Sequence, residues 1–162
     1  MSQVDPASFT RAMRRFPTGV AVVTSRKDGR PRGMTLNSFT SVAAQPPMVL
    51  ICVNREARSY LYIATSAAFC VNLLAVEQRD LAEHFSGRVR DRQFEHIPYV
   101  TAATGAPVLP GALAFFDCTV IDERIVASHS IFVGQVAACD TRDGTPLGYL
   151  NGAARDFGVT VE

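Results

Sequence analysis

The alternation of apolar and polar residues along the chain predicts a protein built mainly from β-strands. Apolar and β-branched residues fill GVAVVTS (19–25), and a KDGR turn with an Asp-Gly pair then leads into GMTLNSFTSV (33–42), where apolar and polar residues alternate. Two such runs joined by an Asp-Gly turn are typical of a β-hairpin. We therefore predict a hairpin over residues 19–42.

Further strands are expected in the rest of the chain. MVLICV (48–53) and AFCVNLL (68–74) are continuous apolar runs, as expected for strands that are buried on both faces or that line a closed sheet. Two long strand candidates follow at 112–126 and 129–140, and a turn leads from them to a short strand at 147–150. The pattern therefore predicts six or seven strands.

The first helix is predicted by its capping residues and its apolar spacing. Asp5 followed by Pro6 is typical of a helix start, with an N-cap residue and a proline at the first helical position. Phe9, Met13 and Phe16 then recur at i, i+4 and i+7, which places them on one face. This spacing predicts a short amphipathic helix that a proline then interrupts.

The remaining helices and loops decide the fold class. Two more short helices are expected at 57–65 and 77–85, and the polar segment SGRVRDRQFEH (86–96) is expected to form a long surface loop. Strands that mostly follow one another through turns favour an antiparallel β-barrel over a doubly wound parallel sheet. No repeat, linker or low-complexity stretch is present, so residues 1–162 are predicted to form a single domain.

Composition and charge restrict the class of protein. The 162 residues are 48% hydrophobic and 19% charged, which is ordinary for a globular protein, and the formal net charge of +1 leaves no basic excess for nucleic acid. No apolar run reaches the roughly 18 to 20 residues that span a bilayer, and the N-terminal MSQVDPASF lacks the features of a signal peptide. We therefore expect a cytoplasmic protein that binds neither nucleic acid nor membranes.

The cysteines and histidines predict neither a disulfide framework nor a metal site. Cys52, Cys70, Cys118 and Cys139 are far apart along the chain, and each lies in an apolar stretch. They are expected to be buried and reduced. The three histidines show no metal-ligand spacing with one another or with a cysteine.

A first group of polar residues lies in RGMTLNSFTSV (32–42), which carries Thr35, Asn37, Ser38, Thr40 and Ser41. Hydroxyl and amide groups are costly to bury unless they form hydrogen bonds, so this group favours a bound ligand. The alternative is that alternate side chains of a strand face the solvent.

A second group of polar residues, in CVNREARSY (52–60), directly follows an apolar strand candidate. Asn54 lies at the end of that strand, and Arg58 and Ser59 lie where a helix is expected to begin. Free backbone N–H groups and the helix dipole favour a phosphate at such a place, and two polar strand ends in a small barrel could line one pocket. The alternative is a capped helix entry that is exposed to water.

Five segments of the chain resemble one protein family when they are taken in order. They are RRFPTGVAVVTS, GMTLNSFTSVAAQPPMVLICVNREARSY, LAEHFSG with the nearby RDRQFEHI, SHSIFVGQV and PLGYLNG, and they extend over about residues 8 to 158. The chain is thereby similar to the short-chain flavin reductases, the NAD(P)H:flavin oxidoreductase components of two-component flavin-dependent monooxygenases, which include the 4-hydroxyphenylacetate monooxygenase reductase. Each segment alone is weak support, whereas the collinear set is specific.

The resemblance implies a fold and a cofactor. The fold would be a homodimeric, mainly β split β-barrel with a few short helices, and it would bind FMN or FAD near the dimer interface. The positions that match the family's flavin site are Met34, Thr35, Leu36, Asn37, Ser38, Cys52, Val53, Asn54, Arg58, Ser59 and Phe85.

The resemblance also divides these residues by role. Thr35, Asn37 and Ser38 would hydrogen-bond the isoalloxazine edge and the ribityl chain, helped by the backbone of their neighbours. Residues 52–54 would line the ring and the ribityl side, and residues 58–59 would meet the phosphate. This arrangement would supply the ligand that the two polar groups favour.

His129 receives its role from the same resemblance. In the family this strand typically opens with Gly-Asp-His, whose histidine lies beside the flavin where the nicotinamide stacks, and the sequence here has Ala127-Ser128-His129. Without the family, a strand-end histidine is more often structural than functional. The absence of the aspartate removes an acceptor that could fix the histidine tautomer, and Ser128 is a candidate to replace part of that hydrogen bonding.

The implied function is hydride transfer from NADH, or from NADPH, to FAD or FMN, after which the reduced flavin passes to a partner monooxygenase. The cofactors carry this chemistry, so the protein has to hold two rings stacked and needs no strong acid or base. Three alternatives stay open. They are a non-enzymatic flavin-binding protein on the same fold, an FMN-dependent oxidase resembling the pyridoxamine phosphate oxidases, and a structural or partner-binding barrel with no cofactor.

Overall fold

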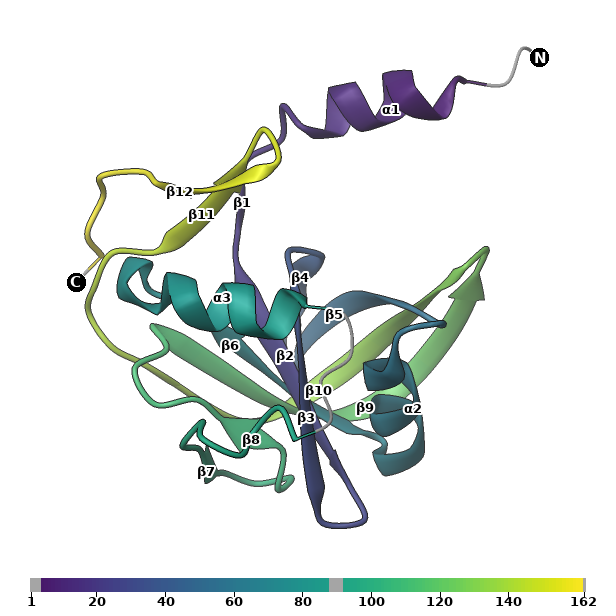
Figure 1. The fold of residues 1–162 in the computed structure, drawn as a ribbon. Helices are drawn as coiled ribbons and strands as arrows, with labels where there is room; N and C mark the ends of the chain where they lie inside the picture. The colour runs from purple at the N-terminus through teal and green to yellow at the C-terminus, as the bar shows by residue number, and fades with distance from the viewer. Residues whose placement is uncertain (1–3, 88–91, 162) are drawn as a thin grey trace.

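A seven-stranded antiparallel sheet with the strand order β3-β2-β6-β9-β10-β5-β4 forms most of the fold (Figure 1). The computed structural model describes residues 4–87 and 92–161. The strands of this sheet are β2 (Ala21–Lys27), β3 (Arg30–Leu36), β4 (Phe39–Ala44), β5 (Pro47–Asn54), β6 (Ala68–Leu73), β9 (Ala114–Val126) and β10 (His129–Thr141). The prediction of a mainly β-protein is therefore confirmed.

Short elements complete the part of the chain that the structure describes. A three-stranded sheet holds β1 (Thr18–Gly19), β11 (Leu147–Leu150) and β12 (Ala153–Asp156), and a two-stranded sheet holds β7 (Val100–Thr101) and β8 (Pro107–Val108). The helices are α1 (Pro6–Met13), α2 (Arg58–Ser66) and α3 (Arg79–Ser86), with a 3-10 turn, η1 (Val76–Gln78), before α3. The three helices and the strand at 147–150 were predicted, whereas β12 was not.

The predicted hairpin is present in its first part and differs in its second. Asp28 and Gly29 turn the chain between β2 and β3 with φ angles of 49° and 74°, as in the type I′ turn that an Asp-Gly pair favours. However, β3 ends at Leu36, and the following strand, β4, lies at the opposite edge of the sheet. The stretch 33–42 is therefore two strands instead of one.

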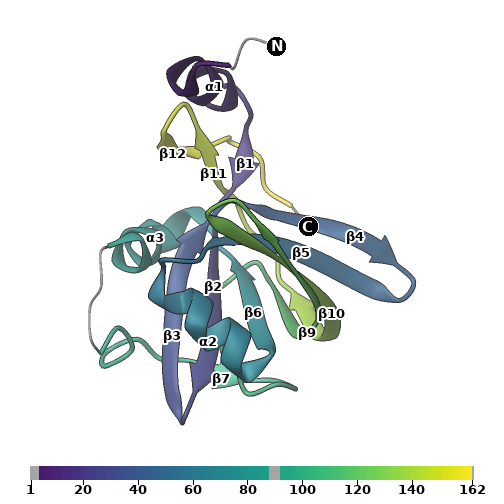
Figure 2. The same cartoon turned by 90° about the vertical axis from the view of Figure 1, so that its right-hand side faces the viewer.

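The short link between β3 and β4 determines the shape of the sheet. Only Asn37 and Ser38 separate these strands, so three Cα–Cα steps, at most about 11 Å, join the two edges. The sheet has to curl until its edges meet at this link, and from there the β4–β5 pair extends away from the β2–β3 hairpin (Figure 2). Because β3 and β4 do not pair with each other within the described residues, the barrel is not closed by hydrogen bonds.

The helices α2 and α3 cover different faces of β2. Val23 and Ile63 belong to one buried cluster, which also holds Phe69 and Phe132 and lies under α2. Val22 belongs to a second cluster that lies under α3 and includes Phe85. Both faces of β2 are thus packed, and apolar side chains buried on both faces explain the continuous apolar run in the sequence.

The helix α1 has the predicted cap, but its apolar face is not buried. The carboxylate of Asp5 accepts a hydrogen bond from the backbone N–H of Ser8 at 3.0 Å. Phe9 and Phe16 are 60% and 62% exposed, and no residue of α1 is buried. The helix lies beyond the small sheet and projects away from the main sheet (Figures 1 and 2). The spacing of the apolar residues therefore predicted the helix correctly. No part of the described chain covers its apolar face.

The expectation of a surface loop at 86–96 is wrong at Gln93, which is only 5% exposed. Its side-chain Oε1 accepts a hydrogen bond from the backbone N–H of Gly33 at 3.2 Å. Its backbone carbonyl lies 2.8 Å from Nε2 of His84 in α3. These contacts hold the polar side chain against β3, while residues 88–91 of the same segment lie outside the described residues.

The cysteines are buried except at one position. Cys70 and Cys118 are buried, Cys52 is half-buried, and Cys139 is exposed, although burial was expected for all four. Cys139 is exposed because β10 pairs with β5 only as far as Gln135 and continues beside β9 alone. No helix in the described ranges combines the length and the apolar character that a bilayer crossing requires.

The difference in burial predicts different reactivity of the thiols. Burial, with a smaller contribution from the nearby Asp117, raises the pKa of the Cys118 thiol to about 12 and raises the pKa of Cys70 as well. Because the thiolate is the reacting form, iodoacetamide at pH 8 is expected to label Cys139 at least about tenfold faster than Cys70 or Cys118. Mass spectrometry of timed samples measures the rates, and equal labelling in urea is the control. Equal labelling of the folded protein would contradict the burial described here.

Candidate functional site

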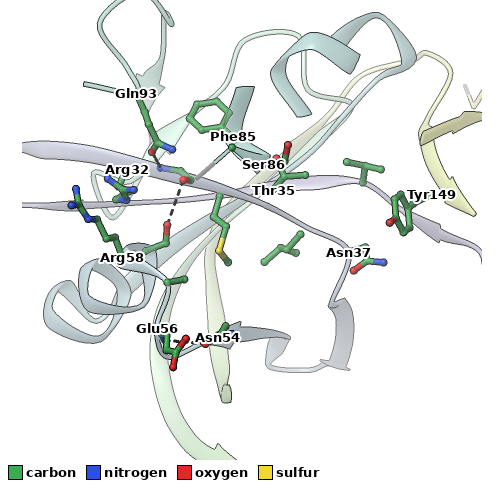
Figure 3. Close-up of a pocket in the computed structure, with 17 residues that line it drawn as sticks. Arg32, Thr35, Asn37, Asn54, Glu56, Arg58, Phe85, Ser86, Gln93 and Tyr149 are labelled. Atoms are coloured by element: carbon green, nitrogen blue, oxygen red, sulfur yellow. Dashed lines mark hydrogen bonds between the residues drawn. The ribbon is translucent and has the colours of Figure 1, made fainter. Parts of the chain in front are cut away.

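A cavity of about 640 Å³ lies between β3, the start of α2 and the end of α3 (Figure 3). We call it the main cavity. Eight of the eleven positions that the resemblance assigned to a flavin lie on its wall. These eight are Met34, Thr35, Leu36, Asn37, Asn54, Arg58, Ser59 and Phe85.

The two polar groups of the sequence meet at this cavity. Asn37 follows the end of β3, Asn54 ends β5, and Arg58 begins α2. The curl of the sheet brings the ends of β3 and β5 together although these strands are not neighbours in it. The convergence of two polar strand ends was predicted, and the geometry shows it.

One end of the main cavity is basic. Arg32 and Arg58 lie together there, with Gln93 on the opposite side of β3 from Arg58 (Figure 3). The N-cap residue of α2 is Ala57, which has no side chain to cap the helix, so the first-turn N–H groups are not satisfied by a capping side chain. Basic side chains beside such a helix start favour a phosphate or another anion.

Asn54 stabilises the turn that leads into this helix. Its Oδ1 accepts a hydrogen bond from the backbone N–H of Glu56 at 2.9 Å, and its backbone carbonyl accepts one from Ala57 at 3.0 Å. Ser59 is buried in the first turn, and its hydroxyl donates to the carbonyl of Gly33 at 3.4 Å. The strand end and the helix start are therefore fixed relative to β3.

The other end of the main cavity holds the side chains of Asn37 and Tyr149 (Figure 3). Between the two ends, the hydroxyl of Thr35 donates to the carbonyl of Ala82 in α3 at 2.7 Å. This hydroxyl can therefore act toward a ligand only as an acceptor. Amide and phenol groups at one end and arginines at the other give the cavity a marked polarity.

The position of Phe85 depends on a glycine. Phe85 is 2% exposed, and a Cβ placed on Gly33 would lie 2.7 Å from two of its ring carbons. A side chain at position 33 would therefore push this ring out of the wall of the cavity.

The three other assigned positions lie outside the main cavity. Ser38 and Cys52 line a second cavity of about 860 Å³ between α1 and the strands β4 and β5, and Asn37 and Tyr149 line both. The hydroxyl of Ser38 donates to the carbonyl of Cys52 at 2.8 Å, and burial raises the pKa of the Cys52 thiol. Val53 is fully buried in the core cluster under α2.

His129 is exposed at the start of β10, outside the walls of both cavities. Its partner in the register of β5 is Asn54, and its Nδ1 lies 3.0 Å from the hydroxyl of Ser128. Ser128 thus makes the contact expected of it. Ala127 has a φ of 51°, a conformation that glycine, the family's usual residue there, adopts without the cost of a Cβ.

Several residues of the main cavity were not predicted as site residues. Arg32 stands two residues before Met34 in β3, inside the polar segment 32–42, and it lies close to Arg58 (Figure 3). Gln93 had no local signal, because it reaches the cavity through a contact between distant parts of the chain. The described residues contain no group of three or more histidine, cysteine or acidic side chains that could hold a metal ion.

The class of protein follows from comparison with known sequences and structures. Residues 13–158 match the family described as flavin reductase like domain, and the chain belongs to this family.

Individual relatives agree with that assignment. The chain is 36% identical over 149 residues to the stachydrine N-demethylase reductase subunit Stc3 of Rhizobium meliloti (strain 1021), which is 91% of this chain and 64% of that protein. It is 34% identical to the flavin-dependent monooxygenase reductase subunit HsaB of Rhodococcus jostii (strain RHA1), over 92% of this chain and 76% of that protein. The chain thus spans less than two thirds of the length of Stc3.

The fold has a close counterpart among solved structures. The NADH:FAD oxidoreductase SgcE6 of Streptomyces globisporus C-1027 matches with a TM-score of 0.89 at 34% identity, over 97% of both chains. A mainly β-fold of the flavin reductase kind is therefore shown by sequence and by structure.

Proposed function

We propose that this chain is an NAD(P)H-dependent flavin reductase that transfers hydride from NADH, or from NADPH, to FAD or FMN. The observation that carries the proposal is the polarity of the main cavity, with Arg32 and Arg58 at one end and Asn37 and Tyr149 at the other. A flavin nucleotide has the same polarity, with a phosphate at one end and a flat ring with hydrogen-bonding edges at the other. The relatives Stc3 and HsaB are named reductase subunits, and SgcE6 is named an NADH:FAD oxidoreductase.

In the proposed complex the phosphate lies against Arg58 and the first turn of α2. A guanidinium is suited to this contact because its N–H groups match two phosphate oxygens. Residues 34–37 would hold the ribityl chain and the isoalloxazine edge, and residues 38 and 52, which line the second cavity, would lie on the side of the ring.

The bound flavin supplies the redox chemistry, since its ring accepts the hydride. The chain's own residues bind the flavin, fix its orientation and leave space for the nicotinamide. We assign His129 to positioning the nicotinamide, because it lies across the β5–β10 pairing from Asn54, a residue of the cavity wall. Holding the reactants in order is the protein's main contribution to a reaction of this type.

We further propose that the curled sheet is the split β-barrel of a homodimer. The apolar face of α1 is exposed, and the second cavity, which includes Met13, Phe16 and Leu50, lies between this helix and β4–β5. Large apolar side chains gathered on one surface are typical of an interface. A second copy of the chain seated there would cover α1 and enclose the flavin ring from the open side.

The partner of the reduced flavin is proposed to be a monooxygenase component. The support is the naming of the relatives, since HsaB is the reductase subunit of a flavin-dependent monooxygenase. Because the reaction consumes NAD(P)H, we place the protein in the cytoplasm, where that nucleotide is available.

The test is NADH oxidation, followed by absorbance, with purified protein and added FAD or FMN, and repeated with NADPH. A fluorescence titration of each flavin accompanies it. Turnover that requires flavin is the expected result. If neither flavin binds, the flavin site proposed for the main cavity is refuted.

A second candidate function is a flavin-binding protein without reductase activity. It is favoured by one observation, namely that His129 is exposed and bonded to a serine where the family has a carboxylate. Flavin binding without turnover by either nucleotide would replace the first candidate by this one.

A further inference from the structure

A two-residue turn, Ala127-Ser128, joins β9 to β10 and places a hydroxyl beside His129. Val126 and His129 are partners in the register of these strands, so they close the turn. The carbonyl of Ser128 accepts a hydrogen bond from the backbone N–H of Arg55 at 3.0 Å. The backbone of Ser128 is therefore held both by its own hairpin and by the turn that follows β5.

The imidazole of His129 has a single hydrogen-bond partner in the part of the chain that the structure describes. Its Nδ1 lies 3.0 Å from the hydroxyl of Ser128, and this hydroxyl has no other partner there. Nε2 makes no hydrogen bond with a described residue. The register partner of His129 is Asn54, which lines the main cavity, and register partners share one face of a sheet. Nε2 is therefore the ring nitrogen that a ligand beside Asn54 can reach.

The chemistry of the two groups determines which of them donates. In a neutral imidazole one ring nitrogen carries a proton and the other accepts a hydrogen bond. The nitrogen without a proton is a much stronger base than a hydroxyl oxygen, so a bond from O–H to nitrogen is stronger than one from N–H to the hydroxyl, as in the serine-histidine pairs of hydrolases. The contact at Nδ1 therefore favours a proton on Nε2.

A carboxylate at position 128 would have the opposite effect. It has no proton to donate, so it accepts from Nδ1–H and leaves Nε2 of a neutral ring as an acceptor. The chain has Ser128 where the family typically has this carboxylate. The exchange reverses the hydrogen bond to Nδ1 and turns Nε2 from an acceptor into a donor.

We propose that Ser128 is a positioning residue that holds the proton of His129 on Nε2, so that this N–H donates to the carboxamide oxygen of the nicotinamide. The inference rests on the proposed function, because it takes the nicotinamide to lie at His129. The carboxamide has one strong acceptor, its oxygen, and an NH₂ group that donates. A donor at Nε2 binds the oxygen and so selects one of the two orientations of the carboxamide.

The first test identifies the protonated ring nitrogen without measuring activity. ¹⁵N NMR of the labelled protein at pH 8.5 distinguishes Nδ1 from Nε2 in each of the three histidines, and the signals of His129 are those missing in His129→Ala. A proton on Nε2 is expected in the wild type and in Ser128→Thr, which keeps the hydroxyl. A protonated Nδ1 is expected in Ser128→Asp.

The second test compares NADH with reduced 3-acetylpyridine adenine dinucleotide, in which an acetyl group keeps the carbonyl oxygen and removes the NH₂ group. An Nε2–H donor can bind both nucleotides, whereas an Nε2 acceptor can bind only the NH₂ group of NADH. At the same pH and at saturating FMN, Ser128→Asp is expected to lower kcat/KM for the analogue about tenfold more than kcat/KM for NADH. Ser128→Thr is expected to change this ratio less than about twofold.

The matched control for the added charge is Ala127→Asp. It places a carboxylate one residue earlier, at an exposed position whose φ of 51° an aspartate tolerates. A proton on Nε2 in the wild type, with a changed ratio in Ser128→Asp alone, supports the inference. A protonated Nδ1 in the wild type overturns it, as does a ratio that is unchanged in Ser128→Asp or that changes equally in Ala127→Asp. In these cases the reductase function stands, whereas wild-type protein that oxidises neither NADH nor NADPH with either flavin refutes that function and the inference with it.

Discussion

Replacement of Arg58 by alanine is expected to weaken FMN binding about 10- to 100-fold, because one charge-assisted contact to phosphate contributes about 1.5 to 3 kcal/mol. Arg58 is the first residue of α2, so its loss removes a cation from the place where the helix N–H groups also attract an anion. Riboflavin has no phosphate, and its affinity is expected to stay within about twofold of the wild-type value. Fluorescence titration of both ligands measures the effect.

The control for this experiment is Arg55→Ala. Arg55 is an exposed arginine three residues earlier, it does not line the main cavity, and its guanidinium lies 5.9 Å from the Tyr60 ring. Its replacement removes the same charge from the same surface and should leave FMN affinity nearly unchanged. If Arg58→Ala weakens riboflavin and FMN by the same factor, the arginine supports the cavity wall and does not bind phosphate.

The second large effect is expected at His129. His129→Ala should lower NADH-dependent turnover about 10- to 100-fold, because a misplaced nicotinamide loses the close stacking that hydride transfer requires. The dissociation constant for flavin should change little, since His129 lies outside both cavities that we assign to the flavin ring and its phosphate. Steady-state kinetics with NADH at saturating flavin separates kcat from KM.

His96→Ala, which removes another exposed histidine, is the control for this variant. Unchanged turnover in His129→Ala would refute the proposed role of His129 in positioning the nicotinamide. His129 would then have only a structural role at the start of β10. A loss of flavin binding in the same variant would show that His129 stabilises the β5–β10 pairing rather than the nicotinamide.

Local sequence signals predicted the elements that depend on near neighbours. The turn between β2 and β3 has positive φ at two successive residues, and an Asp-Gly pair adopts this conformation readily, so Asp28 and Gly29 between two strand-like runs predict the turn. Asp5 and Pro6 likewise determine the start of α1 from within one turn. For such elements, the residues whose interactions determine the structure lie next to one another in the sequence.

Features that depend on contacts between distant parts of the chain could not be predicted from local sequence signals. The periodicity of residues 33–42 fits one strand, and nothing local shows that β4 lies at the far edge of the sheet. Gln93 is buried because Gly33, sixty residues earlier, donates to it. The polar segments at 35–38 and 54–59 favoured a ligand, and their places at two strand ends of a small barrel suggested that they line one pocket, whereas the role of each residue toward a flavin came from the family resemblance.

The two-residue link between β3 and β4 has a consequence for how the protein assembles. The walls of the main cavity come from β3, β5, α2, α3 and β11, and the ends of β3 and β5 meet there only when the seven-stranded sheet has curled. Pairings between distant segments form late, because a long loop has to be closed before each of them stabilises the chain. A partly synthesised or partly folded chain therefore has no site for a nucleotide, and ligand affinity reports on completion of the entire domain.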